Sequence, residues 1–234
     1  MDRTFPGRYI GGVSMVLAPP LLLTGVLLRL QFHFFFPQQL EAYATHPALM
    51  TVSLNCFVAG NIALWPAIVT LAQKIGEKRP LWALWGGSFT LFGLFARTFP
   101  SGADHMAFQM DRMLGVKTAT STVAASYGAF HIVSALSGAI LFGWLLLAIG
   151  AYLSRTLGLI RSIALGLMSA LMLGVLKGSS ATSVIATTGL SIALVPLGVE
   201  ILTAPPRPEM RTALAWSAVV IAVAAALFVL GQLG

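Results

Sequence analysis

Seven apolar stretches, most of them about 20 residues long, constrain this chain more than any other feature of its sequence. They are predicted at Tyr9–Leu28, Pro47–Ala72, Leu81–Phe99, within Thr122–Leu153, and at Ser162–Leu176, Val184–Leu202 and Thr212–Leu230. Only 9% of the residues are charged, whereas a soluble domain has about 25%. A chain so poor in charge cannot cover a surface that faces water. The sequence therefore predicts an all-α, polytopic integral membrane protein with about seven transmembrane helices, in a single domain over residues 1–234.

The lysines and arginines predict the orientation of these helices. If the N-terminus lies inside, nine of the 14 Lys and Arg residues fall in inner segments. The other five are Arg29, Arg97, Arg112, Lys117 and Lys177. Cytoplasmic loops carry an excess of positive charge, so we predict an N-in, C-out, multi-pass protein of the plasma membrane, the inner membrane of a bacterium. We attribute the net charge of +7 to these basic loops and not to a surface that binds nucleic acid. The predicted partner is therefore the lipid bilayer.

The stretch Pro100–Gly115 is the main polar exception between the apolar segments. At about 100° per residue, a helix here has one face that carries polar groups and another that is rich in methionine. The first face holds Asp104, His105, Phe108, Gln109, Asp111 and Arg112. Ser101 has the spacing of an N-cap, and Gly115 is a natural end. We therefore predict a short amphipathic helix on the extracytoplasmic side, outside the third span.

In this orientation all four histidines lie on the outer side, together with Glu41, Asp104, Asp111, Arg97, Arg112 and Lys177. Polar groups beyond those that set the topology predict an outward-facing polar pocket. Asp104 and His105 are the candidate catalytic acid and base. Arg97 and Arg112 are a candidate clamp for a phosphate or carboxylate. The other predicted ligand contacts are His46, Gln109, Tyr127 and His131. We predict that Asp104, His105, Gln109 and Arg112 face a cavity roofed by residues 29–46, and that Arg97 pairs with Asp104 or Asp111.

Simpler roles compete with each of these assignments. Asp104 also suits a helix start, and Asp104 and His105 are adjacent, so they do not face one another on a helix. No HxxxH or HExxH spacing is present, so no metal site is predicted, and the cofactor is left open. Cys56 is the only cysteine, which excludes an internal disulfide and a CxxC motif.

Three functions fit these features. The first is a membrane protein that binds, and in an enzymatic version processes, a lipophilic or amphiphilic molecule of lipid or isoprenoid type. The second is a non-enzymatic transporter, or a self-immunity or resistance protein, for an amphiphilic compound. The third is a structural subunit of a larger membrane complex with a membrane-protein partner. The residues do not decide between an enzyme and a binding protein.

The run GADHMAFQ, together with the loop LQFHFFFPQQLEAYATHPALM, resembles a group of small, uncharacterised multi-span bacterial membrane proteins. A similar G-x-D-H-x-A-F-Q segment in that group follows a span that contains FAR, here Phe95–Arg97. The resemblance covers the first two-thirds of the chain and brings no established activity with it. It implies that Asp104, His105, Phe108 and Gln109 form a shared motif.

Overall fold

The computed structural model describes residues 5–126, 128, 132–171, 174–205 and 210–232, and within these ranges every regular element is helical. The long helices are α1 (Arg8–Leu28), α3 (Pro47–Gly76), α4 (Pro80–Leu114), α6 (Ile132–Leu153), α8 (Ala181–Thr203) and α9 (Met210–Gln232). The short ones are α2 (Gln38–Thr45), α5 (Val116–Ser126), α7 (Leu159–Gly166) and the 3₁₀ turn η1 (Leu167–Ala170). Residues Met1–Leu202 form one compact unit, and Thr203–Gly234, which contains α9, form a second.

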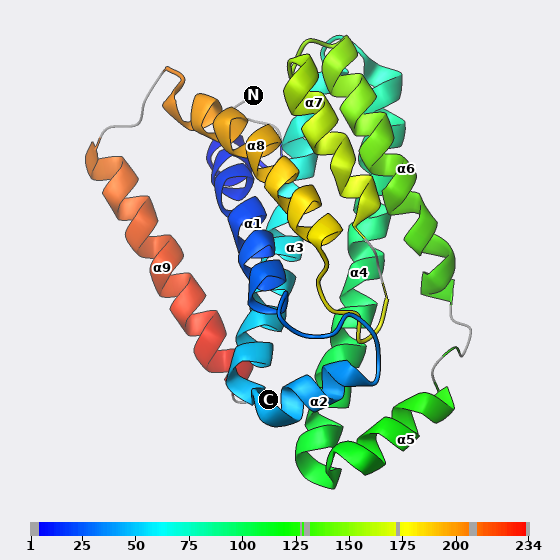
Figure 1. Ribbon diagram of the computed structural model, residues 1–234. Coiled ribbons are helices and arrows are strands. Elements are labelled where there is room, and N and C mark those ends of the chain that lie inside the picture. The colour runs from blue at the N-terminus through cyan, green and yellow to red at the C-terminus, as the bar shows by residue number, and fades with distance from the viewer. Residues whose placement is uncertain (1–4, 127, 129–131, 172–173, 206–209, 233–234) are drawn as a thin grey trace. The chain divides into compact units, whose positions relative to one another are not determined.

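In the first unit the long helices pack in the order α1, α3, α4, α6, and α7 packs against α6 (Figure 1). Glycines bring the backbones close together at the α1–α3 crossing. A Cβ atom on Gly60 would lie 2.8 Å from the backbone nitrogen of Leu22. Nearby, the Ser53 hydroxyl donates a 2.6 Å hydrogen bond to the carbonyl of Gly25. Small residues and a polar contact at the crossing are typical of helices that pack inside a membrane.

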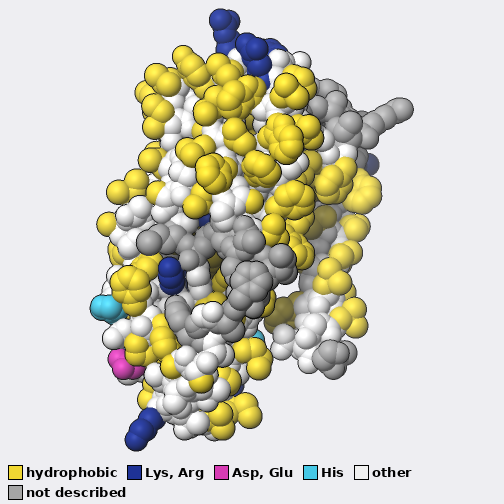
Figure 2. Space-filling model, turned by 90° about the vertical axis from the view of Figure 1, so that its right-hand side faces the viewer, with side chains coloured by type: hydrophobic (Ala, Val, Ile, Leu, Met, Phe, Trp, Pro, Cys, Tyr) yellow, Lys and Arg dark blue, Asp and Glu magenta, His cyan; other side chains and the backbone are white. Residues whose placement is uncertain are grey.

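Within the described residues, four helices are long and apolar enough to cross a membrane, which supports the predicted membrane character of the chain. They are Arg8–Leu28, Pro47–Gly76, Ala181–Thr203 and Leu214–Gln232. Two shorter apolar helices, Gly138–Leu153 and Leu159–Ala170, add to them. Figure 2 shows that apolar side chains gather over the upper part of one face, with lysine or arginine side chains at its top and at its lower edge. Large exposed side chains such as Phe92, Phe95 and Phe142 suit contact with lipid.

The predicted separate amphipathic helix is wrong, because α4 runs without interruption for 35 residues through Pro100. Proline removes one hydrogen bond from a helix, but neighbouring groups can compensate inside a membrane protein. Ser101 does not cap a new helix. Its hydroxyl donates instead to the carbonyl of Arg97, at 3.1 Å. The predicted end at Gly115 is confirmed: α4 stops at Leu114, and Gly115 has a φ of 80°.

The predicted fifth span, Ser162–Leu176, is helical only as far as Ala170, the end of η1. The described residues from there to Ser180, here called the 171–180 segment, form no helix, and α8 then begins at Ala181. Gly174 and Leu176 have φ angles of 152° and 50°, which a helix does not contain. Gly174, Gly178 and the pair Ser179 and Ser180 follow this end, and glycine and serine both favour non-helical backbone.

Candidate functional site

A small cavity of about 50 Å³ lies where the end of α1, α3, α4 and the 171–180 segment meet. Four of its lining side chains carry charge: Arg29, Arg97, Asp104 and Lys177. The rest of the lining is Val26, Leu54, Phe57, Pro100, Ser101, Leu171, Gly174, Gly178, Ser179 and Ser183. We call this the arginine cavity. Three cationic groups against one carboxylate make it a site suited to an anion.

Arg97 is the most unusual residue of the arginine cavity. Its side chain is 3% exposed, and none of its three guanidinium nitrogens has a hydrogen-bond partner. Within the described ranges no carboxylate lies within 4.0 Å of it, so the predicted pair with Asp104 or Asp111 is wrong. Asp104 faces the same cavity but makes its hydrogen bond elsewhere. A guanidinium that is both buried and unpaired is costly by several kcal/mol.

Arg29 brings a second guanidinium into the same cavity from the end of α1. It caps that helix, is 5% exposed, and its Nε atom has no hydrogen-bond partner. The guanidinium carbon lies 5.9 Å from the centre of the Phe57 ring, within the range of a cation–π contact. Burial lowers the pKa of Arg29, and the negative charge of Asp104 acts in the opposite direction. In the sequence, Arg29 is the first residue of a predicted loop, and nothing there indicates a role in a site.

Asp104 holds the 171–180 segment in place. One of its carboxylate oxygens accepts a 2.6 Å hydrogen bond from the backbone N–H of Leu176. The carboxyl group lies beyond Phe99, the predicted end of the third span, and is 5% exposed. Burial raises its pKa to about 7, and the Leu176 hydrogen bond and the charge on Arg29 oppose this shift. Further along the segment, the N–H of Gly178 donates to the carbonyl of Phe34 at 2.8 Å.

The N-terminus of α8 also reaches the cavity. Ser180 and Ser183 exchange hydrogen bonds of 3.3 Å between the backbone N–H of one and the hydroxyl of the other. This is the reciprocal arrangement of a capping box, with serine in place of the usual glutamate. Ser179 and Ser183 line the cavity, and they are 5% and 4% exposed. The positive end of a helix dipole adds to the attraction for an anion.

The predicted inward face of α4 is wrong for His105, which is exposed, and Gln109 is half-buried. Arg112 is also exposed and is not part of the arginine cavity, but it lines a separate groove. The buried face holds Asp104, Ala107, Phe108 and Asp111. Their spacing of three, four and seven residues marks a narrower helical stripe than the one that was predicted. His105 is one residue from Asp104 and therefore turns away from it.

The other predicted ligand contacts do not lie in the arginine cavity. His46 is exposed, and its ring nitrogen lies 2.9 Å from the hydroxyl of Thr45. Tyr127 and His131 are outside the described residues. Among residues 29–46, only Arg29 lines the arginine cavity, so these residues do not roof it, and the 171–180 segment forms that wall. Tyr43 and Ala44 line a separate groove together with Arg112. The interruption of an apolar run by Gly174, Gly178 and two serines was the signal that could have located this wall.

Within the described residues, no three His, Cys, Asp or Glu side chains lie close enough together to hold a metal ion. Comparison with known proteins gives no match for this chain: no family model, no curated protein and no solved structure is significantly similar to it. The resemblance of the GADHMAFQ run to a group of bacterial membrane proteins stays a prediction.

Proposed function

We propose that this protein is a multi-pass membrane protein that binds the anionic headgroup of a lipophilic molecule in the arginine cavity. The observation that carries the proposal is the buried guanidinium of Arg97, which has no partner. An anion would remove the cost of that unpaired charge. A guanidinium binds carboxylate or phosphate through a planar pair of donors, so these are the headgroups that we propose.

The surroundings of Arg97 support an anion over a neutral ligand. Arg29 and Lys177 line the same small space, and Asp104 is the only carboxylate among its lining residues. The capped start of α8 adds the partial positive charge of a helix N-terminus. Together these groups resemble an anion site in which cationic side chains and the N-terminus of a helix lie close together.

The size of the cavity limits what it can hold. A volume of about 50 Å³ accommodates a small oxyanion group or a few waters. It cannot enclose an alkyl or isoprenoid chain. We infer that the headgroup enters the cavity and the apolar part of the ligand stays outside, along the apolar surface of the helices. This arrangement fits a ligand of lipid or isoprenoid type.

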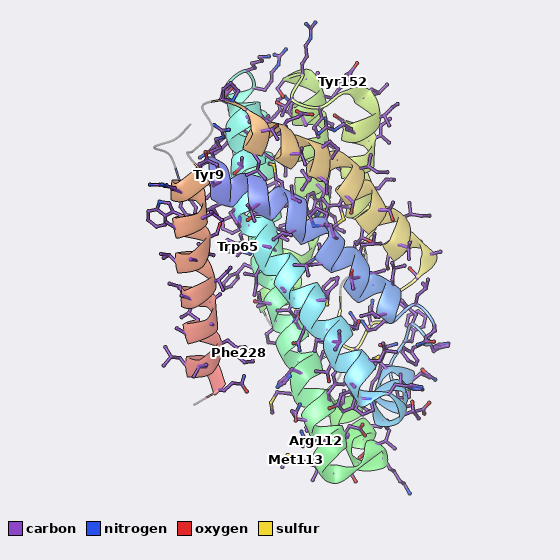
Figure 3. The ribbon with its side chains drawn as sticks, turned by 90° about the vertical axis from the view of Figure 1, so that its left-hand side faces the viewer. Tyr9, Trp65, Arg112, Met113, Tyr152 and Phe228 are labelled. Atoms are coloured by element: carbon purple, nitrogen blue, oxygen red, sulfur yellow. The ribbon has the colours of Figure 1, made fainter. Side chains whose placement is uncertain are left out.

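We propose a seven-span, N-in, C-out topology in the plasma membrane, and the contacts at the helix ends fit the part of it that groups the inner segments together. Arg8 donates to the carbonyl of Ile201, and Arg79 donates to the carbonyl of Leu153. Segments that were assigned to the inner side therefore meet at one end of the first unit. In Figure 3, Tyr9 and Tyr152 lie at that end, and Arg112 and Met113 lie at the other.

A transport role is the second candidate, and the 171–180 segment is the observation that favours it. Non-helical backbone at membrane depth occurs where it lines a cavity, and interrupted helices form the binding sites of many transporters. Asp104 holds this segment through a single hydrogen bond to Leu176. Loss of that bond would free one wall of the cavity. In an enzymatic version, Asp104 would be the acid or base in place of the exposed His105.

Octyl phosphate is a suitable probe for the proposed headgroup site, and octanol is its neutral counterpart. Calorimetric titration of the detergent-solubilised protein should show saturable binding of octyl phosphate alone. Charge-assisted hydrogen bonds contribute about 1.5–3 kcal/mol, so Arg97→Gln should weaken binding about tenfold or more. Arg112→Gln removes an exposed arginine from the same helix and should leave the affinity unchanged.

Two results would overturn the proposal. One is equal affinity of the Arg97→Gln protein and the unchanged protein for octyl phosphate. The other is binding of octanol as tight as that of octyl phosphate, since this would show that the chain and not the charge is recognised. If Arg112→Gln weakens binding and Arg97→Gln does not, the anion binds at Arg112 on the exposed side of α4 and not in the arginine cavity.

A further inference from the structure

A second hollow lies apart from the arginine cavity and shares none of its lining residues. This open groove of about 660 Å³ lies between the end of α2, the first turns of α3 and the junction of α4 with α5. Tyr43, Ala48, Val52, Asp111 and Val116 are among the residues that line it. We call it the Asp111 groove.

Asp111 is the one acidic residue among those that line the groove. Its side chain is 6% exposed, and its Oδ1 atom is buried without a hydrogen-bond partner. Among the described side chains no lysine, arginine or histidine lies within 4.0 Å of this carboxylate. A carboxylate with so little contact with water and no protein cation is stabilised by a positively charged ligand.

The walls of the groove are mostly apolar and partly rigid. Tyr43 is 6% exposed, and its ring stacks flat on Phe108 with 4.4 Å between the ring centres and 3° between the planes. Phe108 is itself 2% exposed, so this pair forms a fixed wall. Ala48, Val52 and Val116 supply aliphatic surface around it. Such a groove suits a compact apolar body with one charged group.

Arg112 also lines the groove but does not neutralise Asp111. It follows Asp111 in the helix, so their side chains diverge by about 100°, and Arg112 is exposed. Figure 3 shows Arg112 at the end of α4. Its charge is therefore in contact with water, which screens it far more than it screens the buried carboxylate.

We propose that the Asp111 groove binds an organic ammonium compound, in which a protonated amine pairs with Asp111 and a compact apolar body fills the groove. The charge of the partner follows from the buried carboxylate, and its apolar character follows from the walls. The site is independent of the anion site proposed above, because the two hollows share no residue. Either proposal can fail without the other.

Phenethylammonium is the probe for this proposal, and 2-phenylethanol is a neutral molecule of nearly the same shape. Titration at neutral pH, followed by intrinsic fluorescence or calorimetry, should show saturable binding of phenethylammonium to the detergent-solubilised protein. Asp111→Asn keeps the shape of the side chain and removes its charge, so the affinity should fall about tenfold or more. Glu41→Gln, which removes an exposed carboxylate from α2 outside the groove, should bind phenethylammonium as the unchanged protein does.

Two further variants keep the test decisive if Asp111→Asn fails to fold. Ala48→Phe fills the groove from an exposed position on α3 and should abolish binding without a change of charge. Arg112→Gln removes a competing cation and should leave the affinity equal or slightly higher. The proposal is overturned if phenethylammonium does not bind, if 2-phenylethanol binds as tightly, or if Ala48→Phe has no effect. Equal binding by a folded Asp111→Asn protein would also overturn it.

Discussion

The guanidinium of Arg97 should lower the stability of the ligand-free protein but strengthen the binding of an anionic ligand. Without a ligand, its guanidinium is buried and unpaired, so an apolar residue of similar size should be tolerated better. Replacement of buried charges by apolar side chains stabilises some proteins by about 1–4 kcal/mol. We therefore expect Arg97→Met to raise the thermal unfolding midpoint of the ligand-free protein in detergent, and to lose the binding of octyl phosphate.

The matched control is Arg112→Met, because Arg112 is an exposed arginine on the same helix. Its substitution should change the stability by no more than about 0.5 kcal/mol. A clear loss of stability in Arg97→Met would contradict the prediction. It would show that the guanidinium has a structural partner in the folded protein.

The sequence indicated the kind of side chain in the site, an arginine, but not which residues the fold brings together there. The sequence predicted an arginine clamp of Arg97, near the end of the third span, and Arg112, in the stretch that follows it. The structure instead places Arg29, from the end of α1, and Lys177, from the 171–180 segment, beside Arg97. Such contacts join residues that are far apart in the chain, and periodicity within one helix does not report them.

At the scale of elements, hydrophobic length predicted the long helices better than it predicted their interruptions. The apolar windows of α1, α3 and α8 fall close to the predicted spans, and Gly115 ends α4. Pro100 was taken as a boundary, but α4 continues through it, and Ser101 bonds back to Arg97. The break after Ala170 was missed because its neighbours are apolar. A proline need not end a helix where neighbouring groups satisfy the backbone carbonyl that it leaves without a partner.

The α1–α3 crossing gives a prediction at this scale. A Cβ atom at position 60 would lie 2.8 Å from the backbone nitrogen of Leu22, which cannot move without the helix. Gly60→Ala should therefore push the helices apart and destabilise the protein by about 1–3 kcal/mol, the usual cost of overpacking. Thermal unfolding in detergent measures this loss.

Gly102 offers the control for this substitution, because it lies in α4 and a Cβ atom there would meet nothing within 4 Å. Alanine has a higher helix propensity than glycine by about 1 kcal/mol. Gly102→Ala should therefore leave stability unchanged or raise it. If the two substitutions have the same effect, close packing at Gly60 does not hold α1 against α3.

At the scale of the whole molecule, every functional argument depends on which end of the first unit faces outward. Chemical labelling can decide this, because Cys56 is the only cysteine and can be replaced by alanine. A single cysteine at Met113, which is 79% exposed, should react with a membrane-impermeant maleimide in intact cells. A cysteine at Glu77, in the loop between α3 and α4, should react only after the membrane is opened.

A periplasm-active reporter fused after Gly234 should give a signal if the chain crosses the membrane seven times from an inner N-terminus. A silent reporter at Gly234 together with a labelled Met113 position would mean an even number of crossings, so either the short α7 and η1 pair or α9 does not cross. Labelling of Glu77 and not of Met113 in intact cells would invert the topology. The Asp111 groove would then open to the cytoplasm, and an ammonium compound would have to reach it from inside the cell. The positive-inside rule argues against that outcome, since Lys74, Lys78 and Arg79 surround Glu77.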